Sequence, residues 1–304
     1  MIRIFGTTLA ALLGLAFGSF LNVCVSRWPE GESVVKPRSH CRSCERTLAW
    51  WENVPLVSWI ALRGRCRTCG EKISWRYPLV ELAVGALWAI EAWRVIPAML
   101  SPNLSPTEGP LIFLYWSGAD VAIGQVILFW LLIALAVLDS DHLWLPNWLT
   151  IPGIILGVLF TSSHFVLADW LGEGPTISLR GTITTNLTGS VIAMVAAGGL
   201  ILLIRWSYWL IRRREGIGLG DAKLMAMLGA WLGLSGAMLS FAVGVMLGAV
   251  FALVVLAVPR ARRESDTWLL SKMPLGTFLC VGGIVSLLWG QALIAAYLHL
   301  VGIE

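Results

Sequence analysis

Eight apolar runs, separated by short polar or glycine- and proline-rich segments, dominate this chain. A helix that crosses the hydrocarbon core of a bilayer needs about 20 apolar residues, and most of the runs approach that length. We expect spans at about 4–25, 78–98, 118–138, 148–167, 185–204, 222–235, 237–258 and 275–297. The sixth run is short, which predicts a tilted or partly interfacial helix. The pattern predicts an all-α polytopic membrane protein with about eight transmembrane helices.

The composition supports the same class. Hydrophobic residues make up 57% of the chain and charged residues only 13%, against about 25% charged residues in soluble domains. The first run has no obvious small-residue cleavage site after it, so we expect a retained span and not a signal peptide. The lipid bilayer is therefore the first expected partner.

The basic residues are distributed unevenly between the two sides of the predicted bundle. They concentrate in segments 26–76, 205–215 and 259–272 and at Lys223, whereas the opposite side keeps only Arg3, Arg94 and Arg180. Lysine and arginine favour cytoplasmic loops. We therefore expect the basic segments in the cytoplasm and both termini outside.

Segment 26–76 carries two C-x-x-C knuckles, Cys41-Arg-Ser-Cys44 and Cys66-Arg-Thr-Cys69. Their layout predicts a structural four-thiolate zinc site of the zinc-ribbon type, although the spacing between the knuckles is slightly long. A pair of disulfides is the alternative, which a reducing cytoplasm disfavours. His40, next to Cys41, is interpreted as a solvated histidine in preference to a spare zinc ligand. Cys24 and Cys280 lie in apolar runs and are expected to be packing residues.

The same segment is rich in tryptophan. Its members are Trp28, Trp50, Trp51, Trp59 and Trp75. Because tryptophan prefers the membrane interface, we expect this segment to lie against the bilayer. Basic residues interleaved with aromatic ones also occur in nucleic-acid-binding proteins. The predicted topology already accounts for the basic residues, so no nucleic-acid partner is expected.

One aspartate stands at the mouth of the sixth run, in Gly218-Leu219-Gly220-Asp221-Ala222-Lys223. An ionisable group at membrane depth is costly and indicates function. The two glycines would allow a tight turn and the close approach of another backbone to the acid. The alternative is that Asp221 only caps the helix, as aspartate often does.

A pair of aspartates ends the third run, in Leu138-Asp139-Ser140-Asp141-His142, on the same predicted side of the membrane as Asp221. Asp139 follows the apolar run directly, and one of the two acids is expected to be a solvated turn residue. Two carboxyl groups within a few Å share a proton, so one can act as general base and the other as general acid. Such a pair hydrolyses peptides without a catalytic metal. Neither G-x-S-x-G nor H-E-x-x-H occurs in the chain.

Two other functions remain open at this point. A proton-coupled transporter would use Asp139 and Asp221 as a relay, but it would not account for the cysteine knuckles. A non-catalytic assembly factor would dock a partner through the zinc ribbon. Loss of peptide cleavage in variants of the two aspartates would distinguish a peptidase from both the transporter and the assembly factor.

The ordered motifs resemble those of the type IV prepilin peptidases, the leader peptidase/N-methyltransferases of type IV pilus and type II secretion systems. The resemblance rests on the cysteine segment, the two aspartate motifs and three further stretches: Gly18-Ser19-Phe20-Leu21-Asn22-Val23, Glu52-Asn53-Val54-Pro55-Leu56-Val57-Ser58 and Arg76-Tyr77-Pro78-Leu79-Val80-Glu81. It implies that Asp139 and Asp221 are catalytic. Asp141, Gly218, Gly220 and Lys223 would be accessory.

The family implies removal of a short basic leader from prepilins or pseudopilins, after a glycine, at the cytoplasmic face of the bacterial inner membrane. Many members with the cysteine segment also methylate the new N-terminal amine with S-adenosylmethionine. The resemblance assigns no residues to that cofactor, and G-x-G-x-x-G is absent. We hypothesise that some glutamates offset the basic charge of the segment toward a basic leader. The candidates are Glu30, Glu32, Glu45, Glu52, Glu71 and Glu81.

Two departures from the family pattern accompany the match. The family often has P-F-G-P before its last span, where this chain has Pro274-Leu275-Gly276-Thr277, and the outer loop 168–184 looks long. We expect neither departure to touch the catalytic motifs. The expected domains are 1–98, with the cysteine segment and an association with methyl transfer, and 111–304, a six-helix peptidase core.

Overall fold

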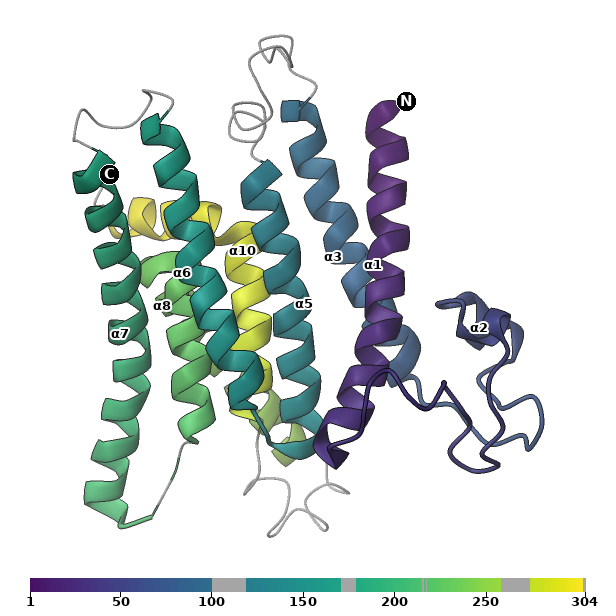
Figure 1. The fold of residues 1–304 in the computed structure, drawn as a ribbon. Helices are drawn as coiled ribbons and strands as arrows, with labels where there is room; N and C mark the ends of the chain where they lie inside the picture. Colours follow the sequence, from purple (N-terminus) through teal and green to yellow (C-terminus); the bar gives the residue numbers. More distant parts are fainter. Residues whose placement is uncertain (100–118, 171–178, 215, 217, 258–273, 303–304) are drawn as a thin grey trace. The chain divides into compact units, whose positions relative to one another are not determined.

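The computed structural model describes residues 1–99, 119–170, 179–214, 216, 218–257 and 274–302, and the long elements among them are all α-helices (Figure 1). The long helices are α1 (Ile2–Arg27), α3 (Arg76–Met99), α5 (Ala119–His142), α6 (Asn147–Trp170), α7 (Leu179–Arg212), α8 (Leu219–Ala257) and α10 (Leu275–Val301). Within these residues the only β-structure is two isolated bridges, His40 with Thr47 and Arg65 with Lys72. The predicted all-α class is confirmed.

Five helices of the described part are long and apolar enough to cross a membrane. One of them, α8, is interrupted at Gly233, whose φ of 68° and ψ of −178° are not helical. The interruption falls inside the span predicted at 222–235, before its boundary with the span predicted at 237–258. The count of eight spans stays a prediction. Segment 259–272 lies outside the described residues, as do residues 171–178 of the outer loop predicted at 168–184; the remaining residues of that predicted loop belong to helices α6 and α7, so the loop is shorter than predicted.

The chain forms two compact units, an N-terminal unit (Met1–Ala134) and a C-terminal unit (Leu135–Glu304). In the N-terminal unit α1 packs directly on α3. A Cβ on Gly14 would lie 2.8 Å from Gly85 Cα, and one on Gly18 would lie 2.7 Å from Glu81 Cα. Small residues at such a crossing let two membrane helices approach closely. The proposed division at 98 and 111 stays a prediction.

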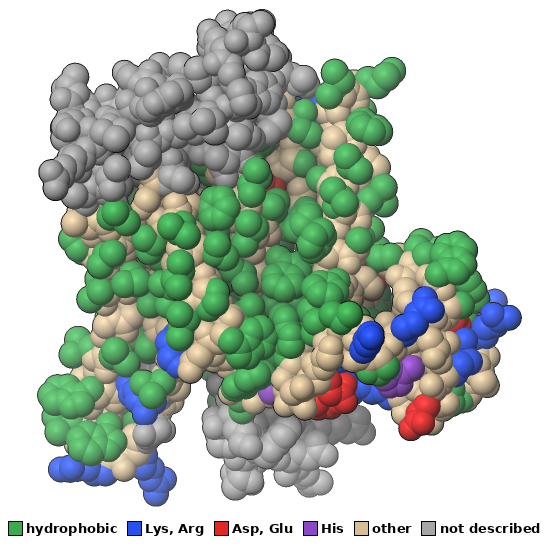
Figure 2. Space-filling model, viewed as in Figure 1, with side chains coloured by type: hydrophobic (Ala, Val, Ile, Leu, Met, Phe, Trp, Pro, Cys, Tyr) green, Lys and Arg blue, Asp and Glu red, His purple; other side chains and the backbone are tan. Residues whose placement is uncertain are grey.

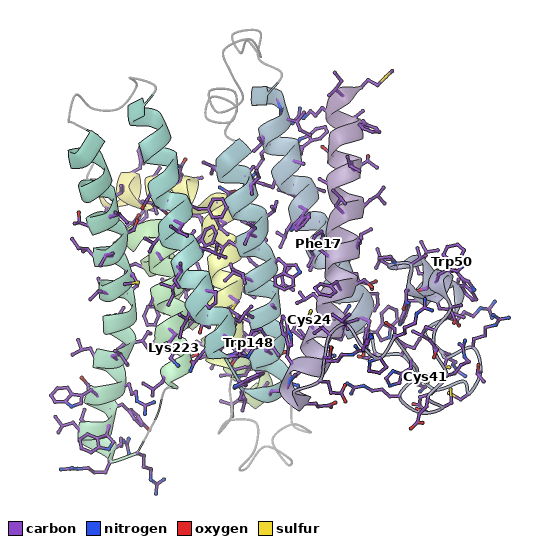
Figure 3. The ribbon with its side chains drawn as sticks, viewed as in Figure 1. Phe17, Cys24, Cys41, Trp50, Trp148 and Lys223 are labelled. Carbon is purple, nitrogen blue, oxygen red and sulfur yellow. The ribbon has the colours of Figure 1, made fainter. Side chains whose placement is uncertain are left out.

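Residues 26–76, which we call the cysteine module, leave α1 and return into α3. The module contains two short 3₁₀ helices, η1 (Trp28–Glu30) and η2 (Trp50–Asn53), and the five-residue helix α2 (Val57–Ala61). Buried Arg27 holds its beginning by donating hydrogen bonds to the carbonyls of Ser33 and Pro37, both at 2.8 Å. Figure 3 shows Cys24 on α1 and Cys41 out in the module.

Several large apolar side chains of the cysteine module are exposed, among them Trp50, Ile60 and Trp75. Figure 2 shows apolar side chains over much of the visible helical surface, and lysine and arginine side chains on the module and near the end of α7. An apolar outer surface is what a lipid environment requires. That the module lies against the bilayer remains a prediction, which the exposed Trp50 and Trp75 support.

In the C-terminal unit α8 packs against both α7 and α10. A Cβ on Gly229 of α8 would lie 2.5 Å from the Ala193 carbonyl oxygen of α7, and one on Gly244 would lie 3.1 Å from the Phe278 carbonyl oxygen of α10. The hydroxyl of Ser286 donates to the Gly236 carbonyl at 3.0 Å, which ties α10 to α8. Close helix crossings therefore fix where the ends of these helices lie.

Candidate functional site

Asp139 and Asp141 both lie in the last turn of α5 but differ in burial. Asp139 is 5% exposed, whereas Asp141 is exposed to solvent. Residues two apart on an α-helix point in directions about 200° apart, because each residue turns the helix by about 100°. The buried position at the end of the apolar run is therefore 139, and Asp141 is the more solvated acid.

Asp139 is held by the start of α10. Its Oδ2 accepts a hydrogen bond from the Thr277 backbone N–H at 2.7 Å, and the Thr277 hydroxyl lies 3.1 Å from the same atom. That hydroxyl also lies 3.0 Å from the Ala136 carbonyl oxygen, and its single hydrogen donates to one of the two at a time. These donors stabilise negative charge on Asp139.

The expectation that the Pro274–Thr277 departure leaves the catalytic motifs untouched is therefore wrong. Besides the Thr277 hydrogen bonds, a Cβ on Gly276 would lie 2.9 Å from Asp139 Cγ. The sequence gives no local sign of this contact, because 138 positions separate Asp139 from Thr277. Only the packing of α10 brings the two together.

Asp221 is buried, with 9% of its surface exposed, in the first turn of α8. Because α8 begins at Leu219, Asp221 is the third helical residue and not the N-cap. Its carboxyl accepts a hydrogen bond from the Gly218 backbone N–H, as the acid of a capping box does. The carboxyl interacts electrostatically with that of Asp139, and both interact with the buried thiol of Cys280. The C-terminal unit thus brings the two sequence-predicted acids together.

The accessory residues surround this pair in different ways. Leu145 fills the space beside Gly220 and Gly276. A Cβ on Gly220 would lie 3.0 Å from Leu145 Cβ, and a Cβ on Gly276 would lie 3.0 Å from Leu145 Cδ1. Gly220 therefore admits a side chain, not the second backbone that we expected. Lys223 donates a hydrogen bond to the Asn147 side-chain oxygen and so ties α8 to the first residue of α6.

The four cysteines of the module form one cluster, with all four sulfur atoms within 4.8 Å of one another. The two knuckles repeat the same turn: Cys41 N–H donates to the Arg46 carbonyl, and Cys66 N–H donates to the Glu71 carbonyl. The Cys41 and Cys69 sulfurs lie 3.7 Å apart. A tetrahedral zinc site with Zn–S bonds of about 2.3 Å places its sulfurs roughly 3.8 Å apart. The cluster therefore fits a zinc ion.

The surroundings act differently on two cysteines of the cluster. Backbone N–H groups of Cys69 and Thr68 donate to Cys66 and lower the pKa of its thiol to about 6, whereas burial and hydrogen bonds with the other three cysteines raise the pKa of Cys69 to about 12. Arg46 donates two hydrogen bonds to the buried Glu52 carboxylate, at 2.7 and 3.0 Å, and thereby lowers the pKa of Glu52. His40 is exposed and lies outside the cluster, in line with our interpretation of it as solvated.

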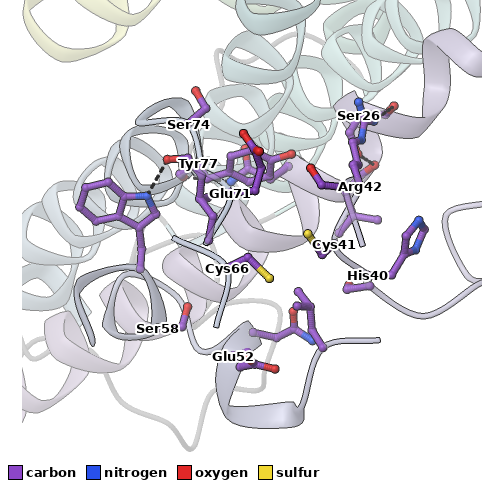
Figure 4. A pocket seen from close by; sticks show the side chains of 18 of the residues that line it. Ser26, His40, Cys41, Arg42, Glu52, Ser58, Cys66, Glu71, Ser74 and Tyr77 are labelled. Carbon is purple, nitrogen blue, oxygen red and sulfur yellow. Dashed lines mark hydrogen bonds between the residues drawn. The ribbon is translucent and has the colours of Figure 1, made fainter. Parts of the chain in front are cut away.

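A cavity of about 600 Å³ lies inside the N-terminal unit, between the cysteine module and the ends of α1 and α3 that join it (Figure 4). All six glutamates considered above line it. So do Cys41 and Cys66, Tyr77 of α3, and Asn22 of α1. The sequence did not single out Asn22 beyond the stretch Gly18–Val23. Its side-chain amide in an otherwise apolar run is the feature that could have marked it.

Metal analysis provides a direct test of the cluster. Protein purified in detergent is expected to contain about one zinc per chain, and Cys66→Ser is expected to lose most of it because one of four thiolates is gone. Cys24→Ala is the matched control, since Cys24 is a buried cysteine outside the cluster. Full zinc content in Cys66→Ser would rule out a four-cysteine site.

Two family models match the chain. The bacterial peptidase A24 N-terminal domain matches residues 12–95, which include the cysteine module. The type IV leader peptidase family matches residues 126–253, which include Asp139 and Asp221. No solved structure matches the chain at a significant level.

Curated relatives match over nearly the whole chain. A prepilin leader peptidase/N-methyltransferase of Stutzerimonas stutzeri is 33% identical over 95% of this chain and 93% of its own length. Its counterpart in Pseudomonas aeruginosa is 32% identical over 96% of this chain and 93% of its length. A type 4 prepilin-like proteins leader peptide-processing enzyme of Escherichia coli is 32% identical over 92% of both chains.

Proposed function

Because this chain belongs to the type IV leader peptidase family, we propose that it is a membrane-embedded aspartic endopeptidase with Asp139 and Asp221 as its catalytic pair. Its substrates are prepilins or pseudopilins, from which it removes the basic leader after a glycine. The observation that carries the proposal is the pair of buried, interacting carboxyl groups at two helix ends. Membership of this family favours a peptidase over a proton-coupled transporter.

The hydrogen bonds of the two acids suggest different roles. Asp139 has the Thr277 donors and is the ionised member, which takes a proton from the attacking water. Asp221 holds the shared proton and gives it to the scissile carbonyl oxygen as the water oxygen bonds to the carbonyl carbon. The C–N bond of the resulting gem-diol then breaks as the leaving amine takes a proton from Asp139, while one gem-diol hydroxyl returns its proton to Asp221 and becomes the carbonyl oxygen of the new carboxyl group. Burial strengthens each of these interactions.

The position of the pair suits a prepilin. Asp139 ends an apolar helix and Asp221 begins another, so both lie near the end of a predicted span. The apolar helix of the substrate would lie in the bilayer, and its leader junction would reach the same depth. We place this surface on the cytoplasmic side of the bacterial inner membrane, as the basic loops predict.

The same protein is proposed to methylate the new N-terminal amine. Its relatives carry the name N-methyltransferase, and the cysteine module lies within the matched N-terminal domain. S-adenosylmethionine, when bound, supplies the methyl group. Zinc held by Cys41, Cys44, Cys66 and Cys69 would have a structural role, because four thiolates leave no open position for a substrate.

Thr277 provides the test of how Asp139 is held. Thr277→Val keeps the backbone N–H and removes the hydroxyl, so we expect kcat to fall about 5- to 10-fold, the loss of about 1 kcal/mol. Thr277→Ser keeps both donors and should stay within about 2-fold of wild type. Cleavage of a model prepilin in detergent measures both. A fully active valine variant would show that the hydroxyl does not support Asp139.

A further inference from the structure

The substrate proposed above sets a condition on where its apolar helix can lie. The leader junction must reach Asp139 and Asp221, and the apolar helix must run from there into the bilayer. It must therefore pass along a helix of this protein that begins or ends at the catalytic pair. Four helices meet this condition: α5 contains Asp139, α8 contains Asp221, α10 begins at the Thr277 donors, and α6 begins at Asn147, which Lys223 of α8 contacts.

Three of these helices have no free face next to the pair. Among the described residues, none is exposed at 124–139 of α5 or at 221–233 of α8. In the described range 275–288 of α10, the only exposed residue is Val281, at 38%. A substrate helix could not pack along α5, α8 or α10 here without displacing the side chains that already cover them.

The fourth helix, α6, has an exposed apolar face. The face consists of Trp148, Ile151, Ile155 and Leu159, each 46–59% exposed, which we call the α6 stripe. Their spacing of three or four residues places them on one side of the helix, and α6 also packs on α7 and α8. The stripe is about 16 Å long, which is about half the thickness of the hydrocarbon core of a bilayer.

The α6 stripe begins beside the catalytic pair. Trp148 directly follows Asn147, whose side-chain oxygen accepts the Lys223 hydrogen bond, and Figure 3 shows Trp148 and Lys223 near the adjoining ends of α6 and α8. The Trp148 ring packs edge to face on that of Trp144, with 6.5 Å between their centroids. A helix on the stripe would therefore have its end at the depth of Asp221.

The charge at this end suits a basic leader. Among the side chains that the structure describes in the C-terminal unit, Asp141 is the only exposed carboxylate, and it lies between Asp139 and the beginning of α6. A contact between exposed charges is weak, so it steers the leader but does not hold the substrate. Lipid tails are as apolar as the stripe, and helices in a bilayer therefore associate through packing. A junction already bound at the pair raises the effective concentration of the attached helix at the stripe.

We propose that the α6 stripe is the docking face for the apolar helix of the prepilin. The inference rests on the proposed peptidase function and deepens it, because it names the surface that binds the membrane part of the substrate. Lipid alone and a second copy of this chain are the other possible occupants, and the experiments below distinguish all three.

Photo-cross-linking tests the docking face directly. A benzophenone amino acid replaces Ile151 in Asp139→Asn protein, which keeps the substrate uncleaved, and the protein is mixed with a model prepilin in lipid vesicles. Irradiation is expected to shift the protein on a denaturing gel by the mass of the prepilin. Cross-links only to lipid, or only to a second copy of the chain, would overturn the proposal.

Val195 of α7 is the matched position for this label. It is 61% exposed, and it lies at a similar depth because both helices pack on one stretch of α8. In that stretch α6 contacts Lys223 and Trp231, and α7 contacts Ala222 and Gly229. The label at 195 should give no prepilin adduct; equal adducts from both positions would show that the prepilin has no preferred face.

Kinetics provide a second test that does not use a label. Ile151→Ala combined with Ile155→Ala keeps the face apolar but removes packing, so KM for a full prepilin should rise about 5-fold while kcat stays within about 2-fold. A short peptide with the leader junction but no apolar helix should be cleaved as by wild type. An equal loss on both substrates, or an unchanged KM for the prepilin, would contradict docking at the stripe.

The control for this double variant is Ile192→Ala combined with Val195→Ala, which thins an exposed face of α7 and should leave both substrates unaffected. Wild-type protein that cleaves the prepilin but gives no adduct from position 151 would refute this inference and leave the peptidase proposal standing. Wild-type protein that cleaves neither the prepilin nor the short peptide would refute the peptidase proposal itself.

Discussion

Asparagine in place of either Asp139 or Asp221 is expected to lower cleavage of a model prepilin by about 10²–10⁴-fold. The change keeps the size of the side chain and most of its hydrogen bonds but removes the group that accepts or gives up a proton. Because both acids are buried within a packed unit, the variants should still accumulate in the membrane. Release of the leader by purified protein, followed by mass spectrometry, measures the rate.

Asp141→Asn is the matched control for this pair. Asp141 lies two residues from Asp139 in the same helix but is exposed, so cleavage should stay within about 3-fold of wild type. If Asp141→Asn is inactive while Asp139→Asn cleaves, the catalytic acid of the first motif is the other one. If all three variants cleave at the wild-type rate, the aspartic mechanism is wrong.

Gly276→Ala is expected to lower kcat by about 10²-fold, through the geometry of the pair and not its chemistry. The added Cβ would lie 2.9 Å from both Cγ and Oδ2 of Asp139 and 3.0 Å from Leu145 Cδ1. Real Cβ atoms do not approach so closely, so the Asp139 carboxyl must move. A displacement of about 1 Å of a reacting group costs rate on this scale. KM should change much less than kcat.

The control for this glycine is Gly199→Ala in α7, where an added Cβ would meet no atom within 4 Å. Alanine favours a helix over glycine by about 1 kcal/mol, so this variant should cleave normally and unfold no more easily than wild type. A Gly276→Ala enzyme with wild-type kcat would show that the start of α10 does not set the position of Asp139.

Local patterns predicted much of this molecule because local physics decides it. The two C-x-x-C knuckles form the same turn twice, since short backbone hydrogen bonds close each of them, and the spacing alone predicted that the four cysteines would cluster. The end of an apolar run identified the pair Asp139 and Asp141, and the family resemblance chose Asp139, which is the buried one of the two. The two adjacent runs predicted as separate spans both lie in α8, whose interruption at Gly233 falls inside the first of them.

The rest depends on contacts between residues far apart in the chain. Thr277 belongs to a motif that was expected to lie away from the catalytic pair, yet its backbone N–H is a hydrogen-bond donor to Asp139. Asn22 and Glu81 lie on different helices and come to one cavity only because Gly18 lets α1 approach α3. No periodicity or spacing encodes such a meeting.

The paired action of the two acids is tested most directly by comparing Asp139→Asn, Asp221→Asn and the double variant in long incubations with a model prepilin. Acids that act as one unit are not additive, because the loss of either one already removes the shared function. The double variant is therefore predicted to cleave no more slowly than the slower single variant. A double variant whose rate falls by the product of the two single effects would contradict the account, since each acid would then act on its own.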